Sequence, residues 1–322
     1  MRQFTAGPNE EGVRLSRFVL RVTQNLPSSV LYKSFRTRRI KVNGKKAEPD
    51  ARLAEGDVVA LYLNDEFFPS AAPWPAKAAF APLPPASFET VWQNKAIAIL
   101  YKPEGVPCHS GAPGVPSLLE AFTASLIQIG EYEPQTESSF APALCNRIDQ
   151  GTEGLVAAAK TYPALRDMNQ LIRLNLVAKN YLCITVGTPP TGELQAHLVR
   201  NKATHTVTVS ARPAPGSKPI ATGVNILARK TGYSLCEIAL LTGRNHQIRA
   251  HLAFLGAPLL GDKKYGDARA NRQHPLASQA LCAWKLAFAP NLPPENTLAG
   301  LAGREFTAET ARLPAYWASL AE

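Results

Sequence analysis

Two short stretches of this 322-residue chain bring acidic, basic and hydrogen-bonding residue types together. Residues 146–154 read NRIDQGTEG and place Asp149 two positions after Arg147, and residues 242–251 read TGRNHQIRAH. A lone carboxylate such as Asp149 can attack an electrophilic carbon, remove a proton or stabilise positive charge that develops in a reaction. Because a cleft that excludes water disfavours a charged carboxylate, an acid in such a role needs a cation nearby.

Taken one at a time, these residues have ordinary structural explanations. An Asp before a Gly-Thr turn is most often a cap, and a strand tyrosine such as Tyr181 is usually part of the core. His246 and His251 lie five positions apart, a spacing that does not place both rings on one face of a helix, so we predict no metal site. Five scattered cysteines without a C-x-x-C pair indicate reduced thiols in a cytosolic protein.

Four motifs occur in the order in which RluA-type pseudouridine synthases carry similar ones. They are the two stretches above, KNYLCITVG at residues 179–187 and GDKKYG at residues 261–266, and the resemblance extends over nearly the whole chain. It implies an enzyme that converts uridine in RNA to pseudouridine without a cofactor. That reaction breaks the bond between carbon-1 of the ribose and the base nitrogen, turns the base and joins its carbon-5 to the sugar.

The resemblance implies catalytic roles for three residues. Asp149 matches the carboxylate near carbon-1, Arg249 matches the cation that pairs with it, and Tyr181 matches the tyrosine that stacks on the target base and helps remove the carbon-5 proton. One acid is chemically adequate, because the base itself is the incoming nucleophile. A glycoside hydrolase would need a second carboxylate to activate water, and Glu153 is the candidate for that rival function.

Four further residues are expected to contact RNA in the catalytic part of the chain. A base inside folded RNA must leave its stack before a protein can reach its sugar, and Arg147 matches the family residue that enters the vacated space. Lys102, in the YKPEG segment, His246 and Gln247 complete this set.

Two positions depart from the family pattern. Asn146 stands where the family usually has His, and Glu153 stands where it usually has Ser. Asn keeps a hydrogen-bonding side chain but has no imidazole charge, whereas Glu adds an acid to a loop that is expected to face phosphates. We therefore expect local RNA contacts or substrate choice to differ here. The retained Asp149 and Arg249 indicate an active enzyme.

The first 63 residues carry much of the positive charge of the chain. They hold 12 basic and 6 acidic residues, which gives +6 of the net charge of +10. Residues 28–46 alone contain seven Lys and Arg and no acid. Such a concentration on one small module favours attraction to phosphates over a general solubility adjustment.

This basic segment has the pattern of a small α+β domain. Apolar spacing predicts a helix over residues 15–22 and a second short helix that Ser28 or Ser29 caps. Asn43-Gly44 predicts a hairpin turn, and residues 58–63 predict a final strand. The order and spacing resemble the αL-type RNA-binding module shared with a small-subunit ribosomal protein. The resemblance implies RNA contacts from Lys33, Arg36, Arg38, Arg39 and Lys41.

Six prolines between residues 64 and 87 predict an extended linker, after which residues 88–322 form the catalytic domain. Alternating and β-branched runs predict strands at 96–101, 155–159, 181–186, 207–210, 224–228 and 234–241. Thr161 is expected to begin a helix with Pro163 in its first turn. The pattern is α+β, in agreement with the mixed, mainly antiparallel sheet and central cleft that the resemblance implies.

The sequence therefore predicts a cytoplasmic, monomeric RNA pseudouridine synthase that acts on large-subunit ribosomal RNA, with transfer RNA as the alternative substrate. No apolar run approaches the roughly 20 residues that span a bilayer, so no membrane segment is expected. A non-catalytic RNA-binding or ribosome-assembly factor is a rival from another class. It would bind RNA without needing Asp149.

Overall fold

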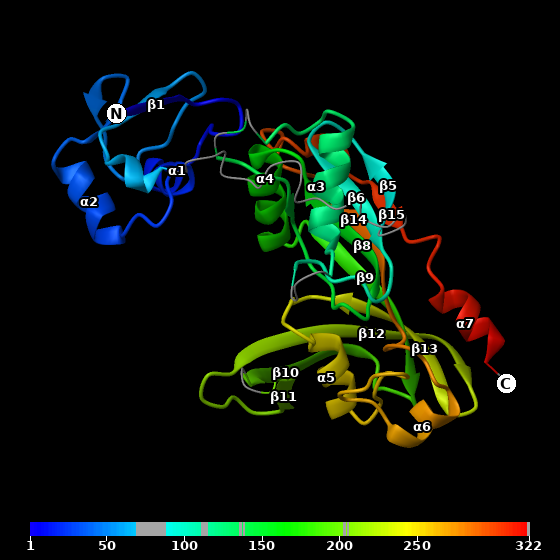
Figure 1. Ribbon diagram of the computed structural model, residues 1–322. Helices are drawn as coiled ribbons and strands as arrows, with labels where there is room; N and C mark the ends of the chain where they lie inside the picture. Colours follow the sequence, from blue (N-terminus) through cyan, green and yellow to red (C-terminus); the bar gives the residue numbers. More distant parts are fainter. Residues whose placement is uncertain are drawn as a thin grey trace.

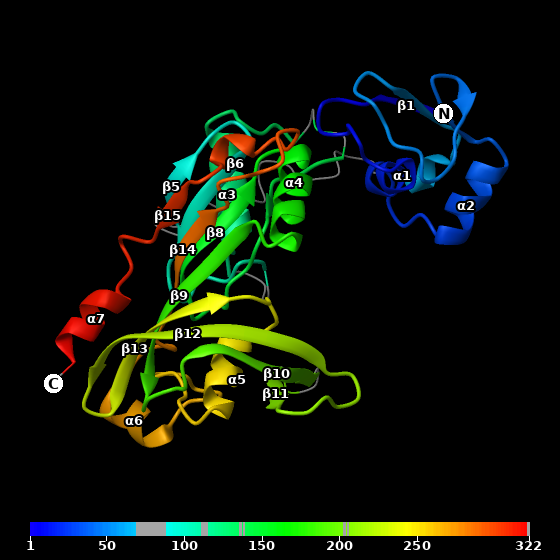
Figure 2. The ribbon, with the colours of Figure 1, turned by 180° about the vertical axis from the view of Figure 1, so that it is seen from behind.

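The computed structural model describes residues 1–68, 88–110, 115–134, 137, 139–201, 204 and 206–320. Within these residues two β-sheets organise the chain, a small one near the N-terminus and a large one after residue 88 (Figure 1). The N-terminal unit that contains the small sheet lies beside helix α4 (Tyr162–Arg173). The C-terminal helix α7 (Leu313–Ser319) lies on the other side of the molecule, as the view from behind also shows (Figure 2).

The small sheet has the order β1-β4-β2-β3 and is antiparallel throughout. Its strands are β1 (Arg2–Thr5), β2 (Ile40–Val42), β3 (Lys45–Lys46) and β4 (Val58–Leu61). Helices α1 (Leu15–Val22) and α2 (Ser28–Arg36) bury their apolar side chains with those of the sheet in one cluster. Asn43 and Gly44 have positive φ angles of 51° and 74°, as a two-residue hairpin turn requires.

Three details of this N-terminal unit differ from the prediction. The sequence did not predict β1. Pro27, rather than Ser28 or Ser29, precedes the first turn of α2, and no side chain caps that helix. The predicted linker begins later than residue 64, because Asp65–Phe67 form the 3₁₀ helix η1 and Phe68 is buried with the unit. The rest of the predicted linker, residues 69–87, lies outside the described residues.

The large sheet has eleven strands within the described residues, in the order β11-β10-β12-β13-β9-β14-β8-β6-β5, with β7 paired to β8 and β15 to β14. Its pairs are antiparallel except for β14 with β8, so the sheet is mixed, as predicted. The sequence missed β5, β7, β10, β14 and β15. The strands are β5 (Glu89–Gln93), β6 (Ile97–Lys102), β7 (Ala143–Leu144), β8 (Glu153–Ala159), β9 (Val177–Val186), β10 (Gly192–Asn201), β11 (Thr206–Ser210), β12 (Lys218–Lys230), β13 (Tyr233–Leu240), β14 (Leu281–Phe288) and β15 (Glu305–Thr307).

Helices pack on both faces of the large sheet. Helices α3 (Leu118–Gln128) and α5 (Gln247–Phe254) share a core cluster on one face, and α4 and α7 contribute to the cluster on the other. Helix α4 begins one residue after the predicted start at Thr161, and Thr161 caps it. Two short helices, α6 (Ala268–Gln273) and the 3₁₀ helix η3 (Ala299–Leu301), complete the set. In the part of the chain described, no helix is long and apolar enough to cross a membrane.

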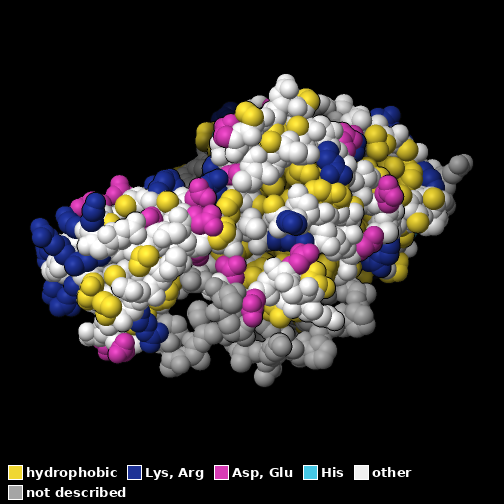
Figure 3. All heavy atoms as spheres, turned by 90° about the horizontal axis from the view of Figure 1, so that it is seen from above, with side chains coloured by type: hydrophobic (Ala, Val, Ile, Leu, Met, Phe, Trp, Pro, Cys, Tyr) yellow, Lys and Arg dark blue, Asp and Glu magenta, His cyan; other side chains and the backbone are white. Residues whose placement is uncertain are grey.

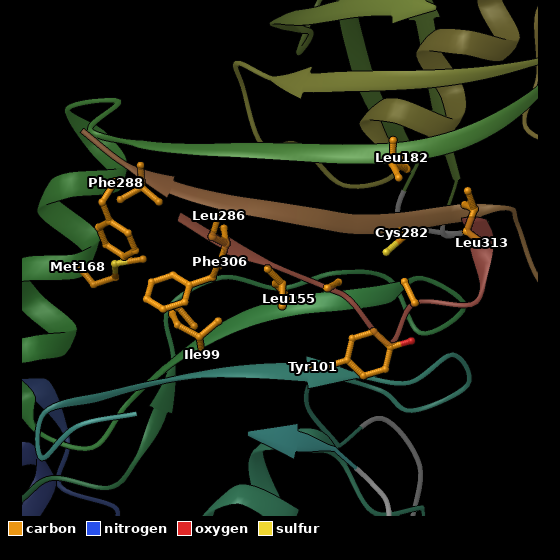
Figure 4. Close-up of a cluster of buried hydrophobic side chains, with 14 of the residues drawn as sticks. Ile99, Tyr101, Leu155, Met168, Leu182, Cys282, Leu286, Phe288, Phe306 and Leu313 are labelled. Carbon is orange, nitrogen blue, oxygen red and sulfur yellow. The ribbon is translucent and has the colours of Figure 1, made fainter. Parts of the chain in front are cut away.

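These two clusters, the largest of the sheet, arise because side chains alternate between the faces of each strand. On β6, Ile97 and Ile99 belong to one cluster, and Ala98 and Leu100 belong to the other. Figure 4 shows the first cluster, which continues to Leu313 at the start of α7. The second cluster contains Ile148 and Tyr181, so the face covered by α3 and α5 is the one next to the predicted site.

A polar contact holds the N-terminal unit against the start of α4. The amide of Asn9 donates to both carboxylate oxygens of Glu137 at 2.9 and 3.0 Å and accepts from the backbone N–H of Tyr162 at 3.0 Å. Arg21 donates to the carbonyl of Ser139 at 2.8 Å, and its guanidinium carbon lies 5.6 Å from the centre of the Tyr162 ring. These contacts give the N-terminal unit a defined position against the rest of the protein.

Candidate active site

The loop that carries Asp149 joins β7 to β8 and is fixed by backbone hydrogen bonds. The N–H of Thr152 donates to the carbonyl of Asp149 at 3.0 Å, which closes a turn directly after the acid. The carbonyl of Gln150 accepts from the N–H of Gly105 at 2.9 Å and from the ammonium of Lys102 at 3.1 Å. Asp149 is therefore held on a short, tied turn, which limits the positions that its carboxylate can adopt.

Gly154 lets this turn enter the sheet. Its φ is +119°, and a Cβ at this position would lie 2.3 Å from the carbonyl oxygen of Ala283 on the neighbouring strand β14. Strand β8 runs parallel to β14 at this point, with Gly154 paired to Ala283. A residue with a side chain would push the two strands apart and would displace the turn that carries Asp149.

Arg249, in the first turn of α5, links two carboxylates. Its Nη1 donates to Oδ2 of Asp149 at 2.9 Å, while Nε and Nη2 donate to the two oxygens of Asp262 at 2.7 and 2.9 Å. The backbone N–H groups of Lys264 and Tyr265 also donate to Asp262, at 2.8 and 3.1 Å. The structure thus brings Asp149 and Arg249 together, as predicted, and adds Asp262 as a second partner of the arginine.

The environment keeps Arg249 and Asp262 charged. Burial alone would lower the pKa of Arg249, but the hydrogen bonds and charges of Asp262 and Asp149 raise it above its ordinary value. Burial alone would raise the pKa of Asp262, but the guanidinium of Arg249 and two backbone N–H groups hold it below its usual range. Arg249 therefore presents a permanent positive charge to Asp149.

His246 precedes α5 and lies next to the same carboxylate. Its backbone is left-handed, with φ of 52°, and its Nε2 lies 3.9 Å from Oδ2 of Asp149. Nδ1 of the ring is 2.9 Å from the hydroxyl of Tyr265. Burial lowers the pKa of His246, although the charge of Asp149 opposes this effect. The imidazole is therefore favoured in its neutral form at neutral pH.

A cavity of about 490 Å³ opens over these residues. Tyr181, on β9, lines it and is buried, and burial together with the charge of Asp149 raises the pKa of its hydroxyl. The hydroxyl therefore stays protonated at neutral pH. The residues that line the cavity include Asn146, Arg147, Asp149, Lys179, Tyr181, Arg200, Arg244, His246 and Arg249.

Comparison with known proteins identifies the class of this site. A family profile described as RNA pseudouridylate synthase matches residues 96–254, which include Asp149, Tyr181 and Arg249. Over 291 residues the chain is 30% identical to a Mycoplasma pneumoniae protein named uncharacterized RNA pseudouridine synthase MG370 homolog, with 87% of this chain and 86% of that protein covered. The chain belongs to the RNA pseudouridine synthase family. The resemblance to RluA-type enzymes is confirmed.

Another relative and a solved structure agree with the assignment of this chain to the pseudouridine synthases. The ribosomal large subunit pseudouridine synthase C of Vibrio cholerae is 29% identical over 260 residues, which cover 80% of this chain and 78% of that protein. The structure of human RNA pseudouridylate synthase domain containing 4 superimposes with a TM-score of 0.50 at 22% identity, over 64% of this chain and 88% of that one. The predicted α+β pseudouridine synthase fold is confirmed.

Two residues of the synthase that were predicted to contact RNA have their polar atoms bound within the protein. Lys102 is completely buried, its ammonium donates to the carbonyls of Pro103 and Gln150, and burial lowers its pKa to about 8. Gln247 is 2% exposed, and its amide bonds Thr242, Thr222 and backbone groups. For Lys102 the predicted RNA contact is wrong, because its side chain is completely buried and does not line the cavity. Gln247 lines the cavity, but its amide is already bound to the protein, so its contact with RNA stays a prediction.

Glu153 is also not where the sequence placed it. Glu153 was expected to add an acid to a loop that faces phosphates, but its carboxylate is buried and does not line the cavity. It accepts hydrogen bonds from the hydroxyl of Tyr101 at 2.6 Å and from the N–H of Leu313 at 3.0 Å. Glu153 thus anchors the start of α7 and cannot serve as the second acid of a glycoside hydrolase with Asp149.

Asn146 does lie in the wall of the cavity. Its side-chain oxygen accepts from the N–H of Ala157 on β8 at 2.8 Å, so the departure from His leaves a residue that ties the loop to the sheet. Arg147 is exposed at the edge of the same cavity. Asn146, Arg147 and Asp149 of the first motif therefore all line the same cavity.

Several residues of the site were not predicted individually. Asp262 and Tyr265 belong to the GDKKYG motif, which the sequence offered without roles for its members. Lys179 lines the cavity because it lies two positions before Tyr181 on β9, and residues two apart share a face of a strand. Among the residues described, no group of three His, Cys, Asp or Glu side chains could hold a metal ion.

The predicted RNA contacts of the N-terminal unit lie away from this cavity. Lys33, Arg36, Arg38 and Arg39 are exposed, and Lys41 is partly exposed with its ammonium 5.4 Å from the centre of the Tyr62 ring. Figure 3 shows Lys and Arg side chains gathered at the outer edge of this unit. They form a basic surface that is distinct from the catalytic cavity.

Proposed function

We propose that this RNA pseudouridine synthase modifies uridine in large-subunit ribosomal RNA, with Asp149 as its essential carboxylate. The observation that carries the role of Asp149 is its hydrogen-bonded ion pair of 2.9 Å with Arg249, beside Tyr181 in a cavity of about 490 Å³. The choice of RNA is supported by relatives named ribosomal large subunit pseudouridine synthase C in Vibrio cholerae and Haemophilus influenzae.

The proposed reaction needs an ionised carboxylate at carbon-1 of the ribose. Arg249 and His246 both face Oδ2 of Asp149, so we assign the approach to carbon-1 to Oδ1. The bond from carbon-1 to the base nitrogen breaks, the base turns, and its carbon-5 bonds carbon-1. The proton of carbon-5 leaves and the former glycosidic nitrogen gains one, so the product is an isomer. Attack, removal of a sugar proton and charge stabilisation all use the same anion.

Two further residues act on the base and its neighbours in this proposal. Because Tyr181 lines the cavity, we assign its ring to stacking on the target base and its hydroxyl to a part in the loss of the carbon-5 proton. Arg147 enters the space that the flipped nucleotide leaves, because a guanidinium plane stacks on bases and binds phosphate. Its exposed position at the edge of the cavity supports this role.

The N-terminal unit is proposed as a second RNA-binding surface. Its exposed arginines and lysines bind phosphates of folded RNA. The contacts of the unit with the region around α4 set the distance between these basic side chains and the cavity. A substrate must then be large enough to reach both surfaces, which favours ribosomal RNA. We further propose that the enzyme works as a monomer in the cytoplasm.

The decisive experiment is a map of pseudouridines in total RNA from cells with and without the gene. We expect one or more positions in large-subunit ribosomal RNA to disappear and to return with the wild-type gene but not with Asp149→Asn. Loss of a transfer RNA position instead would replace the proposed substrate. An unchanged map would contradict the proposal, and restoration by Asp149→Asn would remove Asp149 from the mechanism.

A further inference from the structure

A histidine and a tyrosine from two different motifs form a hydrogen-bonded pair at the edge of the cavity. The hydroxyl of Tyr265 lies 2.9 Å from Nδ1 of His246, and the two rings meet edge to face with centroids 5.7 Å apart. The same hydroxyl oxygen accepts the backbone N–H of Val207 on β11 at 2.9 Å. His246 is thus connected through Tyr265 to the edge strand of the large sheet.

This arrangement selects one tautomer of the imidazole. The oxygen of Tyr265 already accepts a hydrogen bond from Val207, so its own proton is available for donation. Nδ1 of His246 lies 2.9 Å from this hydroxyl, so we assign it as the acceptor of the proton. A neutral imidazole that accepts at Nδ1 carries its proton on Nε2. The pair therefore fixes Nε2–H as a donor.

This donor lies next to the carboxylate of Asp149 in the wall of the cavity. Nε2 is 3.9 Å from Oδ2 of Asp149, which is too long for a direct hydrogen bond. The two side chains are 12% and 21% exposed, and both line the cavity. The donor is therefore available to a bound ligand next to the carboxylate.

We propose that Nε2–H of His246 donates a hydrogen bond to the 2′-hydroxyl of the target ribose, and that Tyr265 is the positioning residue that holds this donor. The inference rests on the proposed role of Asp149 at carbon-1. The 2′-hydroxyl is bonded to the next carbon of the ring, so a carboxylate that approaches carbon-1 has this hydroxyl beside it. The 2′-hydroxyl is also what distinguishes RNA from DNA at a given site.

A binding cycle in a catalytically silent enzyme tests the contact. The full chain with Asp149→Asn is titrated with the RNA fragment around the mapped uridine, and with the same fragment carrying 2′-deoxyuridine at that one position. We expect the deoxy substitution to weaken binding by about five- to tenfold, the effect of one neutral hydrogen bond. His246→Ala, added to the same background, should weaken binding of the ribose form equally and abolish the difference between the two RNAs.

The role of Tyr265 is tested by the protonation of the two ring nitrogens of His246, which a general loss of protein stability does not change. In protein labelled with ¹⁵N-histidine, the wild-type ring should show a protonated Nε2 and an unprotonated Nδ1. Tyr265→Phe should shift the ring toward a mixture of tautomers and reduce the discrimination between ribose and deoxyribose. The matched control is Tyr233→Phe. Tyr233 makes a similar edge-to-face contact with His274, with centroids 5.1 Å apart, away from the cavity.

Two results would overturn the inference. One is an unchanged preference for the ribose form in the enzyme with His246→Ala, which would mean that the histidine contacts another group such as a phosphate. The other is a proton on Nδ1 in the wild-type enzyme. Because binding is measured without turnover, these outcomes are separate from a failure of the proposed role of Asp149, which turnover by Asp149→Asn would reveal.

Discussion

Asp262 binds the guanidinium of Arg249 through two hydrogen bonds, of 2.7 and 2.9 Å, on the side opposite to Asp149. The two acidic residues therefore bind different nitrogens of the guanidinium, and Asp262 sets the orientation of the Arg249 side chain. We expect Asp262→Asn to lower kcat by about tenfold to a hundredfold, because an active-site group that is misplaced by a fraction of an ångström loses much of its effect. RNA affinity should change by less than a factor of about two, since Asp262 does not line the cavity.

A single-turnover assay measures this effect, and Asp167→Asn is its control. Asp167 is also a buried acid paired to an arginine, with Arg166 at 2.7 Å, but it lies on α4. Its replacement should reduce stability without reducing the rate of the folded enzyme. Equal losses of rate in the two variants would show that the loss at Asp262 reflects stability alone.

The same pair predicts how stability depends on pH. Because Arg249 holds the pKa of Asp262 below its ordinary value despite burial, the ionised carboxyl stabilises the folded state. This contribution is fully present above the unfolded pKa of about 3.9 and is lost as pH falls through the lower folded pKa. At pH 7 the wild type should exceed Asp262→Asn by about 3 kcal/mol in the free energy of unfolding. Urea titrations should show this difference shrinking below about pH 4, and a constant difference would contradict the assignment.

Tyr181→Phe should separate stacking from proton removal. Phe keeps the aromatic ring in the cavity and removes only the hydroxyl, so we expect RNA binding within about twofold of the wild type. The rate of pseudouridine formation should fall by about 10² to 10⁴, the usual contribution of a positioned acid or base. Full turnover would exclude the hydroxyl from the reaction. Tyr101→Phe is the control, since that buried hydroxyl bonds Glu153 and lies outside the cavity.

Motif order predicted which segments meet at Asp149, but the other contacts between distant elements could not be read from it. The pairing of Asp149 with Arg249 followed from the resemblance, whereas the second partner, Asp262, depends on how the loop after α5 folds back. Lys102 was misassigned because charge usually indicates exposure. It ends β6, a strand buried along its whole length, where backbone carbonyls replace water around the ammonium.

Most of the other wrong predictions concern the side of the sheet to which a strand residue points. Glu153 begins β8, and only the pairing of that strand with β6 and β14 decides that its side chain points away from the cavity. Strand β14 was missed because it is mostly buried and its apolar residues do not alternate. In contrast, α1 and α4 were predicted well, since apolar residues at helical spacing specify a buried face locally.

Glu153 should matter for stability rather than for chemistry. Its replacement by Ala leaves the hydroxyl of Tyr101 and the N–H of Leu313 buried without their acceptor, so we expect a loss of about 3 kcal/mol in the free energy of unfolding. Arg312→Ala removes a largely exposed partner of the same carboxylate and should cost less than about 1 kcal/mol. Chemical denaturation measures both variants. If Glu153→Ala changed substrate choice without loss of stability, the structural role would be refuted.

The basic surface of the N-terminal unit should contribute to binding through phosphate contacts alone. Each phosphate contact releases counterions from RNA, so Arg36→Ala combined with Arg39→Ala should reduce the slope of log affinity against log salt concentration by about 2. The value of kcat at saturating RNA should stay within about twofold, because both residues lie in the unit beside α4 and not around the cavity. Arg269→Ala with Arg272→Ala removes two exposed arginines of α6 and is the matched control. Filter-binding titrations at several salt concentrations give the slopes, and equal slopes for the two double variants would mean that the N-terminal unit does not bind RNA phosphates.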